Sequence, residues 1–227
     1  MKRLCANPRK HTLMAQPGII AFASKVELNK KMLRKETFRN FLLAAFFAGL
    51  TAVGGIMAIP VPPVPFTMQS FFVLTSGLFL GPKYGPLSQI LYITMGLAGV
   101  PVFAGGTGGL HYVFSPTFGF LVGFVAVSWV AGLLVSMTKT TKDKPAMLYS
   151  KYVLVCLTAT VTLYAVGLPL FYLNMRYVLK TPLSIVRTFE LALLPFVIPD
   201  LIKAILAAGL ASKTISALRD TGLLPSS

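Results

Sequence analysis

Asp200 and Lys203 lie in the middle of a long apolar stretch, and their spacing of three residues is a pattern that points to chemistry. The stretch covers residues 189–212 and reads FELALLPFVIPDLIKAILAAGLAS. On a helix the two residues share a face, where the carboxylate accepts hydrogen bonds from N–H donors and the ammonium attracts a carboxylate. Ionisable residues inside an apolar span are functional by default, and the alternative is a buried structural ion pair. We therefore take Asp200 and Lys203 as the leading ligand-binding candidates.

Two prolines, Pro195 and Pro199, stand just before this pair. A helix that began at Pro199 would be too short to cross a membrane, because about 14 residues at 1.5 Å each give roughly 21 Å. The span must therefore include both prolines, and a kinked or broken upper half frees backbone groups beside the acid and the base. Binding sites near the middle of a membrane are typically built from such interrupted helices.

Three uncharged polar residues, Gln69, Gln89 and Tyr92, also lie in apolar runs. Gln89 and Tyr92 are three residues apart and share a helix face. Gln69 lies near the outer end of its run, where a contact with a ligand and a hydrogen bond to another helix are equally good interpretations. We include all three among the ligand-binding candidates.

A glycine-rich loop, GGTGG at Gly105–Gly109, interrupts the apolar residues 91–116. Irregular backbone between membrane helices is expected only where it is packed in protein or lines a cavity. Glycine allows positive φ and a close approach to a bound molecule, so we expect Gly105, Gly106 and Thr107 to contact a ligand. The alternative is a flexible surface turn. The loop lacks the GK[ST] ending of a nucleotide-phosphate loop.

The residues that enzymes and metal centres need are scarce. The chain has two histidines, His11 and His111, and two cysteines, Cys5 and Cys156, with no spacing typical of a metal site or a nucleophile and its base. We expect no catalytic residues, no metal and no cofactor, and therefore no enzyme. Cys5 and Cys156 are not expected to pair.

The elements that must position these residues are membrane helices. Of 227 residues, 55% are hydrophobic and only 12% are charged, a composition that is typical of an integral membrane protein. At about 20 residues per span, the chain accommodates six spans. The apolar runs predict an all-α fold with spans at about 40–57, 66–80, 87–98 with its flanks, 117–137, 152–173 and 189–212. The segment Ile59–Pro65, IPVPPVP, cannot be helical because of its prolines.

Small residues repeat every four positions in the first span, at Ala44, Ala48 and Ala52. This spacing stacks them on one helix face and lets another helix approach closely. The face is expected to contact either a neighbouring span or a separate subunit.

Basic residues indicate the domain limits and the orientation. Residues 1–39 hold ten of the 21 Lys and Arg, and we expect a tail with an interfacial helix at Val26–Arg39 that is attracted to anionic lipid. The membrane domain is expected at 40–213 and a second tail at 214–227. With six spans, seventeen basic residues fall on one side and Arg176, Lys180 and Arg187 on the other, while Lys203 lies within a span. Both termini are therefore predicted in the cytoplasm, and nucleic-acid binding is not expected.

Four segments resemble the BioY family, the biotin-binding S components of energy-coupling factor (ECF) transporters. In order, they are IPVPPVPFTMQS, GLFLGPKYGPLSQILYITMGLAGVPVFAGGTGG, SPTFGF and LLPFVIPDLIKAILA. The resemblance covers about Phe41 to Ala211, and the N-terminal tail is longer than is usual in the family. It implies a six-helix S-component fold in the bacterial cytoplasmic (inner) membrane and high-affinity capture of biotin from outside. Asp200 and Lys203 match ligand contacts of the family.

The resemblance also implies partners. These are a coupling transmembrane subunit, which Ala44 and Ala48 would dock, and two ATP-hydrolysing subunits. Some family members are described as working without the ATPases, so this dependence stays open, as does a homo-oligomer. The alternatives are an S component for another small carboxylated vitamin, or a membrane assembly subunit whose polar residues only hold helices together.

Overall fold

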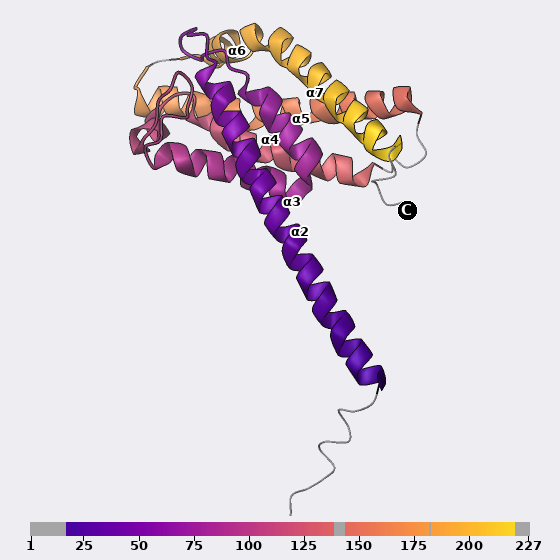
Figure 1. Ribbon diagram of the computed structural model, residues 1–227. Helices are drawn as coiled ribbons and strands as arrows, with labels where there is room; N and C mark the ends of the chain where they lie inside the picture. The colour runs from indigo at the N-terminus through magenta and orange to yellow at the C-terminus, as the bar shows by residue number, and fades with distance from the viewer. Residues whose placement is uncertain (1–16, 139–143, 182, 221–227) are drawn as a thin grey trace, which may run out of the picture. The chain divides into compact units, whose positions relative to one another are not determined.

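The computed structural model describes residues 17–138, 144–181 and 183–220, with the backbone alone at 17–34 and 218–220. In this part of the chain the regular elements are all helical (Figure 1). They are α2 (Pro17–Ile56), α3 (Gln69–Leu97), η2 (Leu110–Phe114), α4 (Phe118–Met137), α5 (Pro145–Leu173), η3 (Asn174–Val178), α6 (Ile185–Ala192) and α7 (Leu194–Asp220). Among these described residues, four segments are long and apolar enough to cross a membrane, namely Lys35–Ile56, Phe118–Met137, Pro145–Val178 and Leu194–Ala217.

The remaining two predicted spans are the halves of α3, which reverses direction at Gly81. Gly81 has φ 73° and ψ −171°, a conformation that glycine adopts without strain, and Pro82 follows it. The halves are antiparallel, because a Cβ built on Gly85 would lie 3.0 Å from Gly77 Cα, and Gln89 Nε2 donates to Ser76 Oγ at 3.1 Å. Counting the halves of α3 separately, the described residues contain the six predicted helices, four of which are long and apolar enough to cross a membrane. That the two halves of α3 also cross it stays a prediction.

Several helix ends differ from the predicted limits. α2 runs from Pro17 without a break at residue 40, α5 starts at Pro145, and α7 continues to Asp220, beyond residue 213. The predicted limits were placed where the apolar runs end. The helices extend further, because backbone hydrogen bonds continue a helix into polar residues outside the hydrocarbon core. The predicted sixth span is broken at Leu193, between α6 and α7. Residues 1–16 and 221–227 of the predicted tails lie outside the described residues.

The chain divides into two compact units, Met1–Phe41 and Leu42–Ser227. In the second unit α4 packs between α3 and α5, and α7 packs on both α3 and α5. Close packing depends on small residues: a Cβ on Gly77 would lie 2.5 Å from the Ser128 carbonyl oxygen. Ala44, Ala48 and Ala52 are 0%, 1% and 7% exposed. Their burial supports contact with neighbouring helices of the same chain, and docking of another subunit at these alanines stays a prediction.

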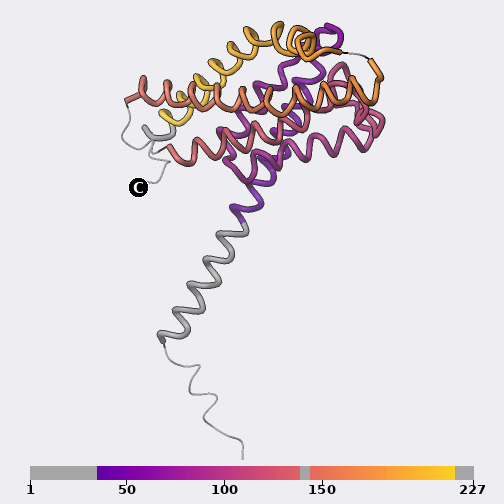
Figure 2. The backbone as a smooth tube through the Cα atoms, turned by 180° about the vertical axis from the view of Figure 1, so that it is seen from behind, coloured from indigo at the N-terminus to yellow at the C-terminus, as the bar shows by residue number. Residues whose placement is uncertain are grey.

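The loops after α2 and α3 lie at one end of the bundle, together with α6 (Figures 1 and 2). The glycine loop is tied to α2, because the Gly105 N–H donates to the Gly55 carbonyl at 3.2 Å. In the loop between α2 and α3, residues 57–68, which we call the proline loop, Ile59 and Phe66 exchange two backbone hydrogen bonds of 2.8 and 3.0 Å. This end of the bundle therefore holds ordered, internally bonded loops above the helices.

Candidate ligand-binding site

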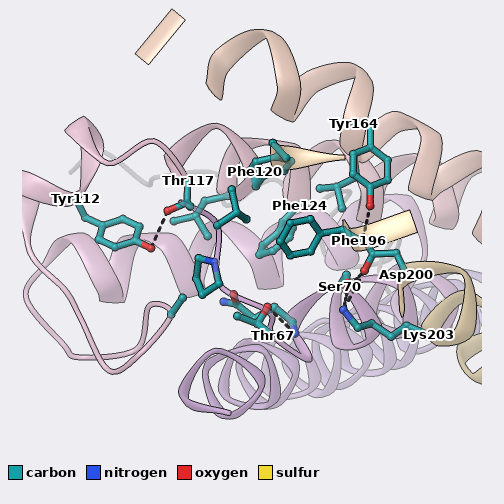
Figure 3. Close-up of a pocket in the computed structure, with 17 residues that line it drawn as sticks. Thr67, Ser70, Tyr112, Thr117, Phe120, Phe124, Tyr164, Phe196, Asp200 and Lys203 are labelled. Atoms are coloured by element: carbon teal, nitrogen blue, oxygen red, sulfur yellow. Dashed lines mark hydrogen bonds and ion pairs between the residues drawn. The ribbon is translucent and has the colours of Figure 1, made fainter. Parts of the chain in front are cut away.

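A cavity lies between α3, α4, α5, α6, α7 and the loops that follow α2 and α3, with about 580 Å³ of unfilled space that includes its open side (Figure 3). Its lining combines polar residues with a larger number of apolar and aromatic ones. They are Val64, Pro65, Thr67, Gln69, Ser70, Ala104, Tyr112, Thr117, Phe120, Leu121, Phe124, Leu163, Tyr164, Ala192, Phe196, Asp200 and Lys203. A largely apolar pocket with a few converging polar groups is the usual form of a small-molecule site.

One end of the cavity is a polar cluster formed by Ser70, Tyr164, Asp200 and Lys203. Asp200 Oδ1 accepts hydrogen bonds from Lys203 Nζ and Ser70 Oγ, both at 2.9 Å, and Oδ2 accepts from the Tyr164 hydroxyl at 2.5 Å. Lys203 Nζ also donates to Ser70 Oγ at 3.1 Å. Three helices, α3, α5 and α7, thus converge on one carboxylate.

The ion pair within this cluster is nearly closed to solvent, since Asp200 and Lys203 are 6% and 8% exposed. Removing one member of a buried ion pair leaves the other charge uncompensated, which makes the two residues interdependent. An ammonium has three N–H donors, of which Lys203 uses two here. One donor of Lys203 therefore remains for a ligand, beside a carboxylate that accepts from three groups.

The middle of the cavity is aromatic. Phe120 and Phe124 come from α4, and Phe196 from the first turn of α7 (Figure 3). Phe196 stacks on Phe66 of the proline loop with ring centroids 4.5 Å apart. These rings offer an apolar surface to the body of a ligand and tie the loop to the site.

The opposite end of the cavity is polar again. The Tyr112 and Thr117 hydroxyls form a hydrogen bond of 3.0 Å, and Thr117 forms a second one with Ser115 Oγ at 3.0 Å. Figure 3 shows these hydroxyls on the far side of the phenylalanines from Asp200. The cavity is therefore polar at both ends and apolar between them.

Three of the predicted site residues, Gln69, Asp200 and Lys203, line this cavity. Tyr92 is fully buried outside the lining, where it accepts a hydrogen bond from Gln69 Nε2 and donates one to the Val102 carbonyl at 3.2 Å. Tyr92 is thus placed to orient Gln69.

The remaining predicted contacts lie outside the lining. Gln89 belongs to a separate buried polar group, in which its Nε2 donates to Thr51, Ser76 and Ser88. Gly105, Gly106 and Thr107 are not part of the lining, although their neighbour Ala104 is. A ligand contact by these four residues stays a prediction.

The sequence reasoning missed Ser70 and Tyr164, which hold Asp200, and the hydroxyl pair of Tyr112 and Thr117. Tyr164 carried a usable signal, because a tyrosine hydroxyl within an apolar span needs a hydrogen-bond partner. Ser70 carried none, since serine commonly bonds to its own helix. Among the described residues, no three His, Cys, Asp or Glu side chains are grouped to hold a metal.

Comparisons with known proteins agree with one another. The model of the BioY family matches residues 26–220. A probable biotin transporter BioY of Lysinibacillus sphaericus is 34% identical over 188 residues, which cover 83% of this chain and 92% of that protein. A biotin transporter BioY of Thermotoga maritima is 36% identical over 173 residues, or 76% of this chain and 94% of that protein.

A crystal structure of the S-component for biotin from an ECF-type ABC transporter matches with a TM-score of 0.68 and 23% identity. The match covers 80% of this chain and 93% of that one. The structural likeness shows that the helices adopt the S-component fold. With the family match over most of its length and relatives above 30% identity, this chain belongs to the BioY family.

Proposed function

We propose that this membrane protein captures biotin and mediates its uptake as the substrate-binding subunit of a vitamin transporter. The observation that carries the proposal is the order of groups along the cavity. The cluster at Asp200 and Lys203 lies at one end, the phenylalanines lie in the middle, and the hydroxyls of Tyr112 and Thr117 lie at the other end. The named functions of the relatives support the same ligand.

Biotin has the matching distribution of groups. A ureido ring with N–H donors and a carbonyl acceptor forms one end, a carboxylate forms the other, and a sulfur-containing ring and an alkyl chain lie between them. The apolar middle suits the phenylalanine surface, and each polar end of biotin has a polar end of the cavity to meet. The ligand can lie in either direction. Lys203 contacts the carboxylate in one direction, and the Asp200–Lys203 pair contacts the ureido ring in the other.

The membrane arrangement is part of the proposal. We place the chain in the bacterial cytoplasmic membrane as a multi-pass protein with both termini inside, which the distribution of Lys and Arg supports. The proline and glycine loops then face outward over the cavity. Family membership supports a coupling transmembrane subunit and two ATP-hydrolysing subunits as partners. The chain itself is proposed to bind and carry its ligand without chemical change.

Binding of radiolabelled biotin to the purified full chain tests the proposal. Saturable binding that an excess of unlabelled biotin displaces is expected, whereas other small carboxylated vitamins are expected to compete weakly. Absence of saturable binding would refute biotin capture. Stronger competition by another vitamin would show that this vitamin, and not biotin, is the substrate. The proposal that the chain is the substrate-binding subunit of a vitamin transporter would then still hold.

A further inference from the structure

Arg176, Lys180 and Arg187, the three basic residues on the predicted outer side, fall within one short segment that covers η3 and the start of α6. Arg187 is paired with Glu190 at 2.8 Å. Arg176 and Lys180 line a pocket with Leu183 and Ser184, and among the described residues neither cation has an acidic partner within ion-pair distance. Two exposed cations thus share a hollow that lacks an anion from the described part of the chain.

An apolar groove lies between α5 and α6, with about 900 Å³ of unfilled space that includes its open side. Leu168 and Thr188 form its buried floor, while Val161, Ile185 and Phe189 on its edges are 67%, 64% and 44% exposed. Its lining is almost entirely apolar, apart from the hydroxyls of Thr188, Tyr164 and Tyr172. A hydrocarbon chain suits such a lining, and a hydrated polar ligand does not.

The groove and the basic pocket are continuous along the chain. Tyr172 lines the groove, and its hydroxyl accepts a hydrogen bond from Arg176 in the basic pocket. Ser184 lines the pocket, and the next residue, Ile185, lines the groove. The cations therefore cap one end of the apolar groove.

The expected depth of Arg176 and Lys180 in the membrane also matches that of a phospholipid head group. The helical segment Pro145–Val178 has 34 residues, more than the roughly 20 that cross the hydrocarbon core, and it ends two residues after Arg176. Arg176 and Lys180, at the end of this long segment, are therefore expected near the level of the head groups. We propose that this place binds an anionic glycerophospholipid, with its phosphate at Arg176 and Lys180 and an acyl chain in the groove. Basic pockets beside membrane helices recognise anionic head groups in this way, and each cation near the surface adds to the attraction. The inner part of the groove includes Tyr164, which also lines the candidate ligand cavity.

The test measures lipid retention by the purified full chain with native mass spectrometry. Dioleoyl phosphatidylglycerol and dioleoyl phosphatidylcholine are the probes, since they have the same acyl chains. Arg176→Gln combined with Lys180→Gln is expected to lower retention of phosphatidylglycerol by about thirtyfold, from the attraction of two cations. Lys83→Gln combined with Lys213→Gln removes the same charge from exposed positions outside the pocket and is the matched control, expected to leave retention unchanged.

Each result has a defined meaning. Loss of phosphatidylglycerol in the first variant alone, with weak retention of phosphatidylcholine throughout, supports the lipid site. Equal retention of the two lipids by the unmodified chain, or equal retention of phosphatidylglycerol by both double variants, overturns it. Displacement of the lipid by an equal concentration of glycerophosphoglycerol, which has the head group without acyl chains, overturns the role of the groove. None of these results depends on biotin binding.

Discussion

Lys203→Met tests both the candidate site and the direction in which a ligand lies in it. The side chain is 8% exposed and its ammonium donates to Asp200 and Ser70, so methionine replaces a buried charge with an apolar chain of similar length. If the spare donor of Lys203 contacts the carboxylate of biotin, the variant loses a charge-assisted hydrogen bond worth about 2–3 kcal/mol, or roughly thirty- to 150-fold in affinity.

The assay is equilibrium binding of biotin and of its uncharged carboxamide analogue to the purified chain. The carboxamide cannot form the ion pair, so its affinity is expected to fall by less than that of biotin. Lys213→Met is the matched control, because Lys213 lies in the same helix, is exposed and does not line the cavity. Equal losses for the two ligands would contradict a carboxylate contact and favour the ureido ring at the Asp200–Lys203 pair. Unchanged affinity for both would refute the site.

Loss of folding is separated from loss of binding by a second variant. Lys203→Met alone leaves Asp200 as a buried charge without its ion-pair partner, which costs about 3–5 kcal/mol of stability. Asp200→Asn combined with Lys203→Met removes both charges and is expected to melt at a higher temperature than Lys203→Met alone. A lower melting temperature for the double variant would contradict the ion pair as the source of the destabilisation.

Three further predictions concern the Tyr164 hydroxyl, the buried alanines of α2 and the orientation in the membrane. Tyr164→Phe removes the hydroxyl that donates to Asp200 at 2.5 Å, and biotin affinity is expected to fall by about 1.5–3 kcal/mol in the binding assay. An unchanged affinity would show that this hydrogen bond does not hold the Asp200 carboxylate in its binding position. Ala48→Trp forces bulk into a position that is 1% exposed and is expected to destabilise the fold by at least about 1–3 kcal/mol in thermal unfolding, whereas Leu43→Trp at 39% exposure is tolerated; equal effects would contradict the inward orientation of the alanines. Single cysteines at Thr107 and Val61, in a cysteine-free background, are expected to react with an impermeant thiol reagent added outside cells and to be protected by biotin; labelling from the cytoplasmic side alone would refute the orientation.

The sequence by itself predicted the features that depend on neighbouring residues. Apolar runs of the right length predict membrane helices, since each span must satisfy its own backbone hydrogen bonds. The pairing of Asp200 with Lys203 follows from a spacing of one helical turn, and the structure has this ion pair at 2.9 Å. The first prediction needed only the length and hydrophobicity of each run, and the second needed only the helical period.

The tertiary structure alone decided which distant groups meet. Ser70 and Tyr164 reach Asp200 across 130 and 36 residues, and no local pattern records those distances. The two halves of α3 fold back on each other at Gly81, and this reversal brings Tyr92 against Gln69. Gln69 lines the cavity, whereas Tyr92 does not. A polar residue in an apolar helix must find some partner, but the packing of helices determines whether that partner is a ligand or another side chain.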